Sequence, residues 1–113
     1  MANTFTNKKA DLTTTNLTTV YTVPTATTAI IKSILVSEDA GSGTTIDVTL
    51  VDSSSNIFSL FKAKAVGSNT TVELLTQPLV LEESEVLKVQ AAEANELHVI
   101  ASILEVKPRE VTT

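Results

Sequence analysis

Histidine occurs only once in this sequence, at position 98, between Leu97 and Val99. An imidazole can act as a general base or bind a metal, but no nucleophile motif surrounds this one, and a conventional zinc site needs several His or Cys ligands. Cysteine is absent, which excludes disulfides, thiolate metal sites and a cysteine nucleophile. His98 is therefore interpreted as a structural or interface residue.

Two other segments contain residue types that bind ions or phosphates. The acidic turn at 82–85 lacks the spacing by which the carboxylates of a calcium loop converge on one ion. The Gly-Ser-Gly segment at 41–43 is too short for a phosphate-binding loop and has no Lys-Ser/Thr after it. A glycosidase needs paired carboxylates in a cleft, usually lined by aromatic side chains, and this chain has three Phe, one Tyr and no Trp. The sequence predicts no enzymatic activity, no catalytic residue, no metal site and no cofactor.

The charge of the chain narrows the choice of partners. Its formal net charge is −5, and its eight basic residues are scattered except for the pair Lys8-Lys9. Binding to nucleic acid requires clustered basic side chains, so no nucleic-acid partner is expected. No apolar run approaches the ~18 residues that span a bilayer, and the N-terminus has no signal-peptide pattern. We expect synthesis in a cytoplasm and no membrane partner.

The composition favours β-structure in the elements that position these residues. Thr and Ser make up 19 and 10 of the 113 residues, and β-branched residues suit a pleated strand. Strand-like segments alternate with short polar turns, as in a sandwich or barrel. They span residues 17–23, 29–38, 44–52, 56–63, 69–76, 79–81, 85–92 and 96–106.

These segments predict an all-β fold, a single antiparallel β-sandwich or jelly-roll-like domain of about eight short strands. The expected organisation is an extended N-terminal arm at 1–16, the β-sandwich domain at 17–106 and a C-terminal tail at 107–113. We expect the Thr-rich arm to lie outside the core, along a neighbouring protein, where its backbone would pair with a sheet edge. The alternative is that the arm forms an edge strand of its own subunit.

Alternation within single segments predicts which side chains are buried. Ile46, Val48 and Leu50 share one face of 44–52 and should pack with Val86 or Val89 and with Val99 or Ala101. Segments 29–36 and 96–104 are apolar on both faces, which indicates a central strand or a subunit interface. In 29–36 the alternation sets Ile30, Ile34 and Val36 against Ile31 and Leu35.

Several sequence blocks together resemble a known group of proteins. They are the runs at 18–24 and 28–37, Val-Thr-Leu-Val-Asp at 48–52, Pro-Leu-Val-Leu-Glu at 78–82, Leu-Lys-Val at 87–89 and Val-Ile-Ala-Ser-Ile-Leu-Glu at 99–105. Taken together, these blocks resemble small β-sandwich virion structural proteins of tailed bacteriophages, of the cyanophage and marine phage type. Such relatives often have Ala-Gly-Asp after Leu-Glu, where this chain has Glu-Ser-Glu at 83–85. The family implies no catalytic residues.

The resemblance implies a non-enzymatic virion structural protein located in the virion. A capsid decoration (cement) protein that binds the head shell as a symmetric oligomer is the main expectation, with a tail, neck or fibre component as an alternative. A carbohydrate- or receptor-binding β-sandwich module is a further alternative. The expected partners are copies of the chain itself, as a trimer or next a dimer, and the major capsid protein or other virion proteins. The candidate interface residues are Phe5, Leu12, Ile31, Leu35, His98 and Ile100.

Overall fold

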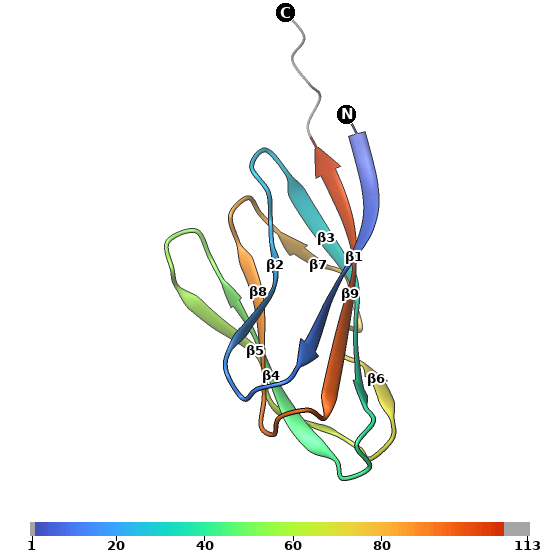
Figure 1. Cartoon of the computed structure of the whole chain (residues 1–113). Coiled ribbons are helices and arrows are strands. Elements are labelled where there is room, and N and C mark those ends of the chain that lie inside the picture. Colours follow the sequence, from blue (N-terminus) through green and yellow to red (C-terminus); the bar gives the residue numbers. More distant parts are fainter. Residues whose placement is uncertain (1, 108–113) are drawn as a thin grey trace, which may run out of the picture.

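A computed structural model describes residues 2–107 of the chain. These residues form nine strands in two antiparallel sheets packed face to face, so the fold is an all-β sandwich (Figure 1). The strands are β1 (Ala2–Leu12), β2 (Thr18–Thr22), β3 (Thr28–Glu38), β4 (Thr44–Val51), β5 (Ile57–Val66), β6 (Thr71–Glu73), β7 (Leu79–Leu81), β8 (Val86–Ala91) and β9 (Leu97–Lys107). No helix long and apolar enough to cross a membrane occurs among the described residues.

The two sheets differ in which strands form their edges. The first sheet, here called the β9 sheet, has the order β1-β9-β3-β6, and β7 also pairs with β3. The second, here called the β4 sheet, has the order β2-β8-β4-β5. The long strands β1 and β5 therefore each form one edge. Between the sheets, the Tyr21 hydroxyl donates a hydrogen bond to Glu105 Oε2 at 2.7 Å, which links β2 to β9.

The core lies between the sheets and is built from aliphatic side chains, as the alternation in 44–52 predicts. Ile46 and Val48 are fully buried and Leu50 packs against the same cluster. Val89 and Val99 are also fully buried, which confirms the predicted grouping. Segment 85–92 forms β8, and its Leu87, Val89 and Ala91 point inward.

A bulge in β3 changes the face that the sequence predicts for one residue. The register of β3 against β9 shifts between Ile31 and Ser33, so Lys32 is an extra residue. Because side chains alternate with a period of two, one extra residue reverses the faces on one side of it. Ile31 therefore shares the buried face with Ile34 and Val36. The predicted grouping of Ile30 with Ile34 and Val36, and of Ile31 with Leu35, is corrected.

The segment expected to be an arm is a strand of the chain's own sheet. β1 pairs antiparallel with β9 along its whole length, from Ala2 opposite Lys107 to Leu12 opposite Leu97. Leu12 is 1% exposed and joins the core. The prediction that residues 1–16 lie outside the sandwich core is therefore wrong for β1, and the alternative of an edge strand of its own subunit is what the structure shows. Of the predicted tail at 107–113, residues 108–113 lie outside the described residues.

Candidate interaction surface

The outer edge of β1 carries backbone groups that no other described strand pairs with. β1 has one neighbour, β9, and its register contains no irregularity over eleven residues. The Leu12 carbonyl accepts a hydrogen bond from the N–H of Asn95, just before β9, at 2.9 Å, so the even-numbered residues direct their backbone groups toward β9. Alternation then directs the N–H and C=O groups of residues 3, 5, 7, 9 and 11 away from the sheet. Such an edge can accept a further strand.

The outer face of the β9 sheet carries an apolar row that crosses four strands. Opposed residues place Phe5 beside Leu104, Leu104 beside Ile30, and Ile30 beside Val80. Phe5 is 77% exposed and Val80 is 56% exposed. A second row pairs Lys9 with Ile100 and Ile100 with Leu35, and these two apolar side chains are 39% and 36% exposed.

A trough lies between these two rows. Its floor crosses three strands of the sheet. Asn7 is opposite Ser102, Ser102 is opposite Ser33, and these side chains are smaller than those of the two rows. A hollow of about 400 Å³ opens there, lined by Phe5, Thr6, Asn7, Lys32, Ser102 and Ile103. The trough is therefore polar along its floor, apolar along its walls, and has an ammonium group at the β3 bulge.

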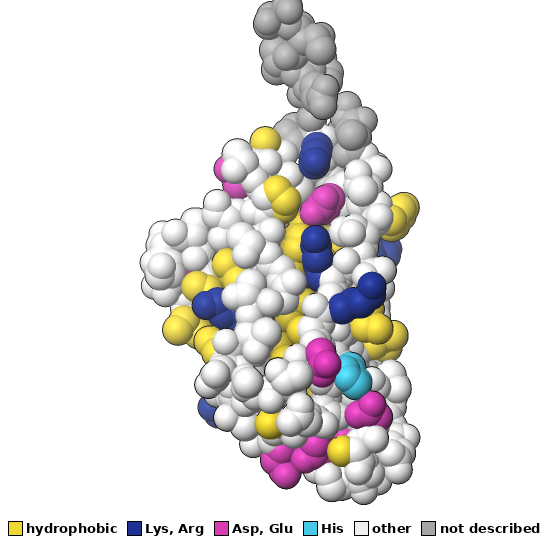
Figure 2. Space-filling view, in the orientation of Figure 1, with side chains coloured by type: hydrophobic (Ala, Val, Ile, Leu, Met, Phe, Trp, Pro, Cys, Tyr) yellow, Lys and Arg dark blue, Asp and Glu magenta, His cyan; other side chains and the backbone are white. Residues whose placement is uncertain are grey.

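Charge is divided along the β1 side of the molecule. Figure 2 shows basic side chains along this side with an acidic side chain between two of them, and further acidic side chains around the histidine and below it. Lys8 and Lys9 are exposed neighbours on β1, and neither forms an ion pair with a residue in the range 2–107. The β1 edge therefore carries two basic side chains without an ion-pair partner among residues 2–107, on a chain of net charge −5.

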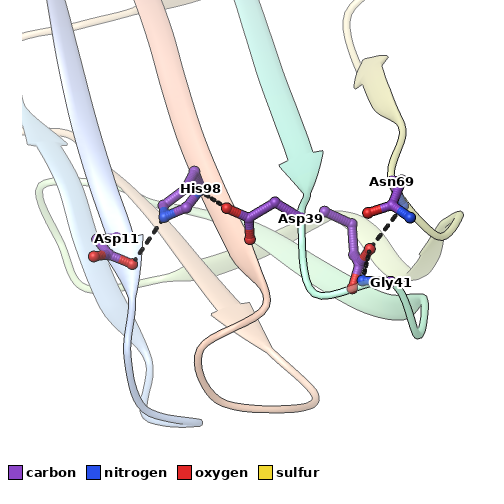
Figure 3. Close-up of polar contacts among 6 residues, drawn as sticks. Asp11, Asp39, Gly41, Asn69 and His98 are labelled. Atoms are coloured by element: carbon purple, nitrogen blue, oxygen red, sulfur yellow. Dashed lines mark hydrogen bonds and ion pairs between the residues drawn. The ribbon is translucent and has the colours of Figure 1, made fainter.

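His98 joins the lower end of β1 to the loop after β3. Its Nε2 lies 3.3 Å from Asp11 Oδ1 and its Nδ1 lies 3.6 Å from Asp39 Oδ2 (Figure 3). His98 is opposite Asp11 in the β1–β9 register, which explains their proximity. All three side chains are well exposed. The two contacts are ion pairs when the imidazole is protonated, and they hold the end of the edge strand rather than a substrate.

Glu38 fixes the loops beside this cluster. Its carboxylate accepts hydrogen bonds from the N–H groups of Asn69 at 2.8 Å and Gly41 at 3.1 Å (Figure 3). It also accepts one from the N–H group of Ser42 at 3.3 Å. These bonds, that from Asn69 foremost, lower the pKa of Glu38 to about 2 against the opposing effect of burial. Gly41 has a φ of 83°, a conformation that a residue with a Cβ rarely adopts. Glu38 therefore acts as an internal anchor.

The partner of Glu38 in this anchor is Glu96, which is also buried. The Ser42 hydroxyl donates to Glu96 and lowers its pKa, but desolvation and the neighbouring carboxyls of Glu38 and Glu93 outweigh that effect, so the pKa of Glu96 is raised. The pKa values of the two carboxyls are therefore shifted in opposite directions. No group of three or more His, Asp or Glu side chains within 2–107 is arranged to hold a metal ion.

The structure separates the six predicted interface residues into two sets. Phe5, Leu35, His98 and Ile100 lie on the outer face of the β9 sheet, where a partner can reach them. Leu12 and Ile31 are 1% and 0% exposed, so their selection as interface residues is corrected. Ile31 was misplaced by the β3 bulge, and Leu12 by the expectation of a detached arm.

The β5 edge carries the second exposed apolar surface, which sequence reasoning did not select. Ile57 is 69% exposed and Phe58 is 52% exposed, and Phe61 is only partly buried. Phe58 is opposite Leu50 and therefore points toward the core side, but β5 extends away from the other sheet (Figure 1). Ile57 and Phe58 lie at the start of β5, an edge strand next to the polar loop at 52–56, and this position could have indicated their exposure.

Comparison with known proteins yields two solved structures of low similarity. No family model matches the chain, and no curated protein sequence matches it. Among solved structures, the C-terminal family 22 carbohydrate-binding module of Clostridium thermocellum Xyn10B is similar with a TM-score of 0.32 and 19% identity over 85% of this chain. A xylan-binding domain of the same family is similar with a TM-score of 0.30 and 20% identity over 80%. The chain spans 66% and 61% of those two structures.

Proposed function

We propose that this chain is a non-enzymatic structural protein of a bacteriophage virion, most specifically a capsid decoration protein that binds the head shell. The observation that supports this proposal is the free, regular edge of β1 next to the exposed apolar rows of the β9 sheet. An exposed apolar patch beside an unpaired strand edge is a feature of protein–protein contact surfaces. The sequence resemblance supplies the class of partner, namely the major capsid protein or another virion protein.

The attachment of the chain to particles tests this proposal. Particles assembled without the chain would be mixed with the recombinant protein, sedimented and quantified by mass spectrometry. We expect the parent protein to bind and a Phe5→Glu, Ile100→Glu double variant to lose most of its occupancy while its circular dichroism spectrum stays that of the parent, since both side chains are exposed on the outer face of the β9 sheet. A parent protein that stays in the supernatant would refute the proposal. Imaging of the loaded particle would distinguish the head from the tail, neck or fibre.

A homo-oligomer, with a trimer ahead of a dimer, is part of the same proposal. The exposed Ile57 and Phe58 of β5 form an apolar surface separate from the β1 edge, so copies can pack there while β1 remains free. Light scattering at high concentration should give a multiple of 12.0 kDa for the parent. A Phe58→Ser variant should then be monomeric, and a monomeric parent would contradict this part of the proposal.

Carbohydrate binding is the second candidate, and a polar hollow supports it. The hollow has a volume of about 280 Å³ and is lined by Thr15, Thr45, Asp47, Gln90, Ala91 and Ala92. Hydroxyl, carboxylate and carboxamide groups suit sugar hydroxyls, although no aromatic side chain lines the hollow to stack on a sugar ring. Affinity electrophoresis in gels with and without xylan is the test. Retardation that is lost in a Gln90→Ala variant would favour this candidate over the structural role.

A further inference from the structure

We propose that β1 binds an extended acidic segment of a partner protein, which pairs antiparallel with β1 and extends the β9 sheet by one strand. This inference rests on the proposed function and names the chemistry of the partner segment. Antiparallel addition continues the direction in which β1 already pairs with β9. Strand addition derives its affinity from backbone hydrogen bonds and its specificity from alternate side chains.

The backbone of β1 is suited to this pairing. Residues 3, 5, 7, 9 and 11 direct their N–H and C=O groups away from β9, and β1 contains no proline and no bulge. An incoming strand can therefore pair along residues 3–9 without any change in the ladder between β1 and β9, whereas the Asp11 carbonyl already accepts the N–H of Thr13 at 2.9 Å. The strands β6 and β7, at the other side of the same sheet, have three residues each and therefore offer far fewer backbone groups for pairing.

The two lysines of the β1 edge favour an acidic partner strand. Lys8 and Lys9 are adjacent, so alternation places their ammonium groups on opposite faces of the sheet. Neither forms an ion pair within the described part of the chain. A strand with acidic residues opposite both positions gains two cross-strand ion pairs, whereas a basic strand places like charges opposite each other.

The outer face of the β9 sheet indicates which side chains fit at two further positions of the partner strand. The residue opposite Phe5 extends the apolar row that Phe5, Leu104 and Ile30 form, so an apolar side chain fits there. The residue opposite Asn7 lies at the open end of the trough, where a small polar side chain fits. In the direction of the partner chain, the expected order is acidic opposite Lys9, acidic opposite Lys8, then apolar opposite Phe5.

A second copy of β1 does not meet these requirements. Antiparallel pairing about a two-fold axis centred on residue 8 or residue 9 places Lys8 or Lys9 opposite itself. Pairing centred on Asn7 places Lys9 opposite Phe5. The one acidic residue of β1, Asp11, faces Lys9 only when the pairing is centred on residue 10, and Phe5 then faces residue 15, which lies outside the strand. The partner is therefore a different segment.

A peptide titration followed by amide chemical shifts tests the inference. The probe is the acetylated and amidated peptide Thr-Asp-Glu-Thr-Thr-Val-Thr, and the control peptide has Lys in place of Asp and Glu. With the acidic peptide, we expect saturable shifts at the amides of residues 5, 7 and 9, and an affinity at least about tenfold above that of the basic peptide. Equal affinity for the two peptides, or shifts confined to other strands, would overturn the inference.

Three variants separate edge pairing from general charge attraction. A Lys8→Glu, Lys9→Glu variant should reverse the preference between the two peptides. Asn7→Pro removes an N–H that faces away from β9, so it should abolish peptide binding while the thermal midpoint changes little. Lys62→Glu, Lys64→Glu makes the same charge change at the β5 edge and should bind the acidic peptide as the parent does. Binding that survives Asn7→Pro would refute strand addition.

The outcomes also separate this inference from the virion role. If the parent protein attaches to particles and the Asn7→Pro variant attaches equally well, the structural role stands and the acidic-strand partner is wrong. If neither protein attaches to particles but the peptide selectivity holds, the virion role is wrong and the edge still binds acidic strands. A dimer that light scattering detects in the parent and not in Asn7→Pro would assign the edge to a second copy.

Discussion

The two long edge strands of this sandwich, β1 and β5, differ in how they are protected against pairing with a further strand. β5 contains two extra residues relative to β4, and Ala63 within it adopts a positive φ of 52°. It also carries Lys62 and Lys64. Bulges and lysines are common devices that keep an edge from pairing with another sheet. β1 has two lysines but no bulge, and its pairing with β9 is regular throughout. The comparison indicates that β5 is closed to strand addition and β1 is open to it.

Both edges depend on one buried side chain near their C-terminal end, and this gives the largest expected effect. Leu12 of β1 and Val66 of β5 are each 1% exposed. Leu12→Ala should cost about 2–5 kcal/mol of unfolding free energy, and Val66→Ala about 1–3 kcal/mol because fewer buried methyl groups are lost. Chemical denaturation measures both, with Phe5→Ala as the exposed control at less than about 0.5 kcal/mol. If Leu12→Ala is as mild as the control, β1 is not anchored in the core.

Acid should loosen the loops that Glu38 holds, at 39–43 and 67–70, before it affects the bulge of β5. Because the pKa of Glu38 is lowered to about 2, its contribution to stability is fully present above its ordinary value of 4.5 and is lost as the pH falls toward 2. The raised pKa of Glu96 has the opposite sign, so its contribution is lost as the pH rises. Amide spectra recorded from pH 6 to pH 2.5 should change first at 39–43 and 67–70. A Glu38→Gln variant should lack this step, and earlier changes at 61–64 would contradict the expectation.

Each edge also has one carboxylate whose removal should have a smaller and unequal effect. Asp47 Oδ1 accepts the N–H of Ala63 at 2.7 Å and its Oδ2 lies 4.0 Å from Lys62 Nζ, so Asp47 stabilises the β5 bulge. Asp47→Ala should cost about 1–3 kcal/mol because a backbone N–H loses a charged acceptor. Asp11→Ala removes only the exposed contact to His98 and should cost about 0.2–1 kcal/mol. Equal costs in thermal denaturation would mean that the bulge does not depend on Asp47.

The smallest expected effect concerns the strain within the β5 bulge. Ala63 has a left-handed backbone conformation, which glycine adopts more readily. Ala63→Gly should therefore raise the unfolding free energy by about 0.5 kcal/mol, whereas Ala10→Gly in the regular β1 should lower it by about 0.5–1 kcal/mol. Denaturant midpoints of the two variants provide the comparison. A loss of stability in Ala63→Gly would show that the positive φ carries no strain.

The sequence predicted most strands because alternation is a local signal. Segment 44–52 indicated its buried face correctly, and segment 85–92 forms the strand β8. What the sequence could not predict depends on distant residues. The β3 bulge is held by Glu73, which accepts hydrogen bonds from the Ser33 hydroxyl and from the Ile34 N–H at 2.8 Å. No local pattern in 28–38 indicates that contact.

The sequence predicted only part of the candidate interaction surface, because alternation is a local signal and strand pairing is not. Leu35 and Ile100 belong to segments that are apolar on both faces, and Phe5 is an isolated apolar residue in a polar segment. All three are exposed, as the sequence predicts for interface residues. The burial of Leu12 differs from the prediction because β1 pairs with β9, and this pairing joins residues 85 to 105 positions apart in the sequence. Such pairing leaves no signature within 1–16 that distinguishes the chain's own sheet from that of a neighbour.

The pairing of Ala2 with Lys107 also has a practical consequence for engineering. The two ends of the described chain lie side by side at one end of the molecule (Figure 1). Residues opposed in an antiparallel pair have Cα atoms about 5 Å apart, so a linker of a few residues can join them. A circular permutant with new termini in the exposed loop at 53–55 should therefore retain the sandwich. In the unpermuted chain, a domain joined directly to Ala2 or to Lys107 would project from that same end.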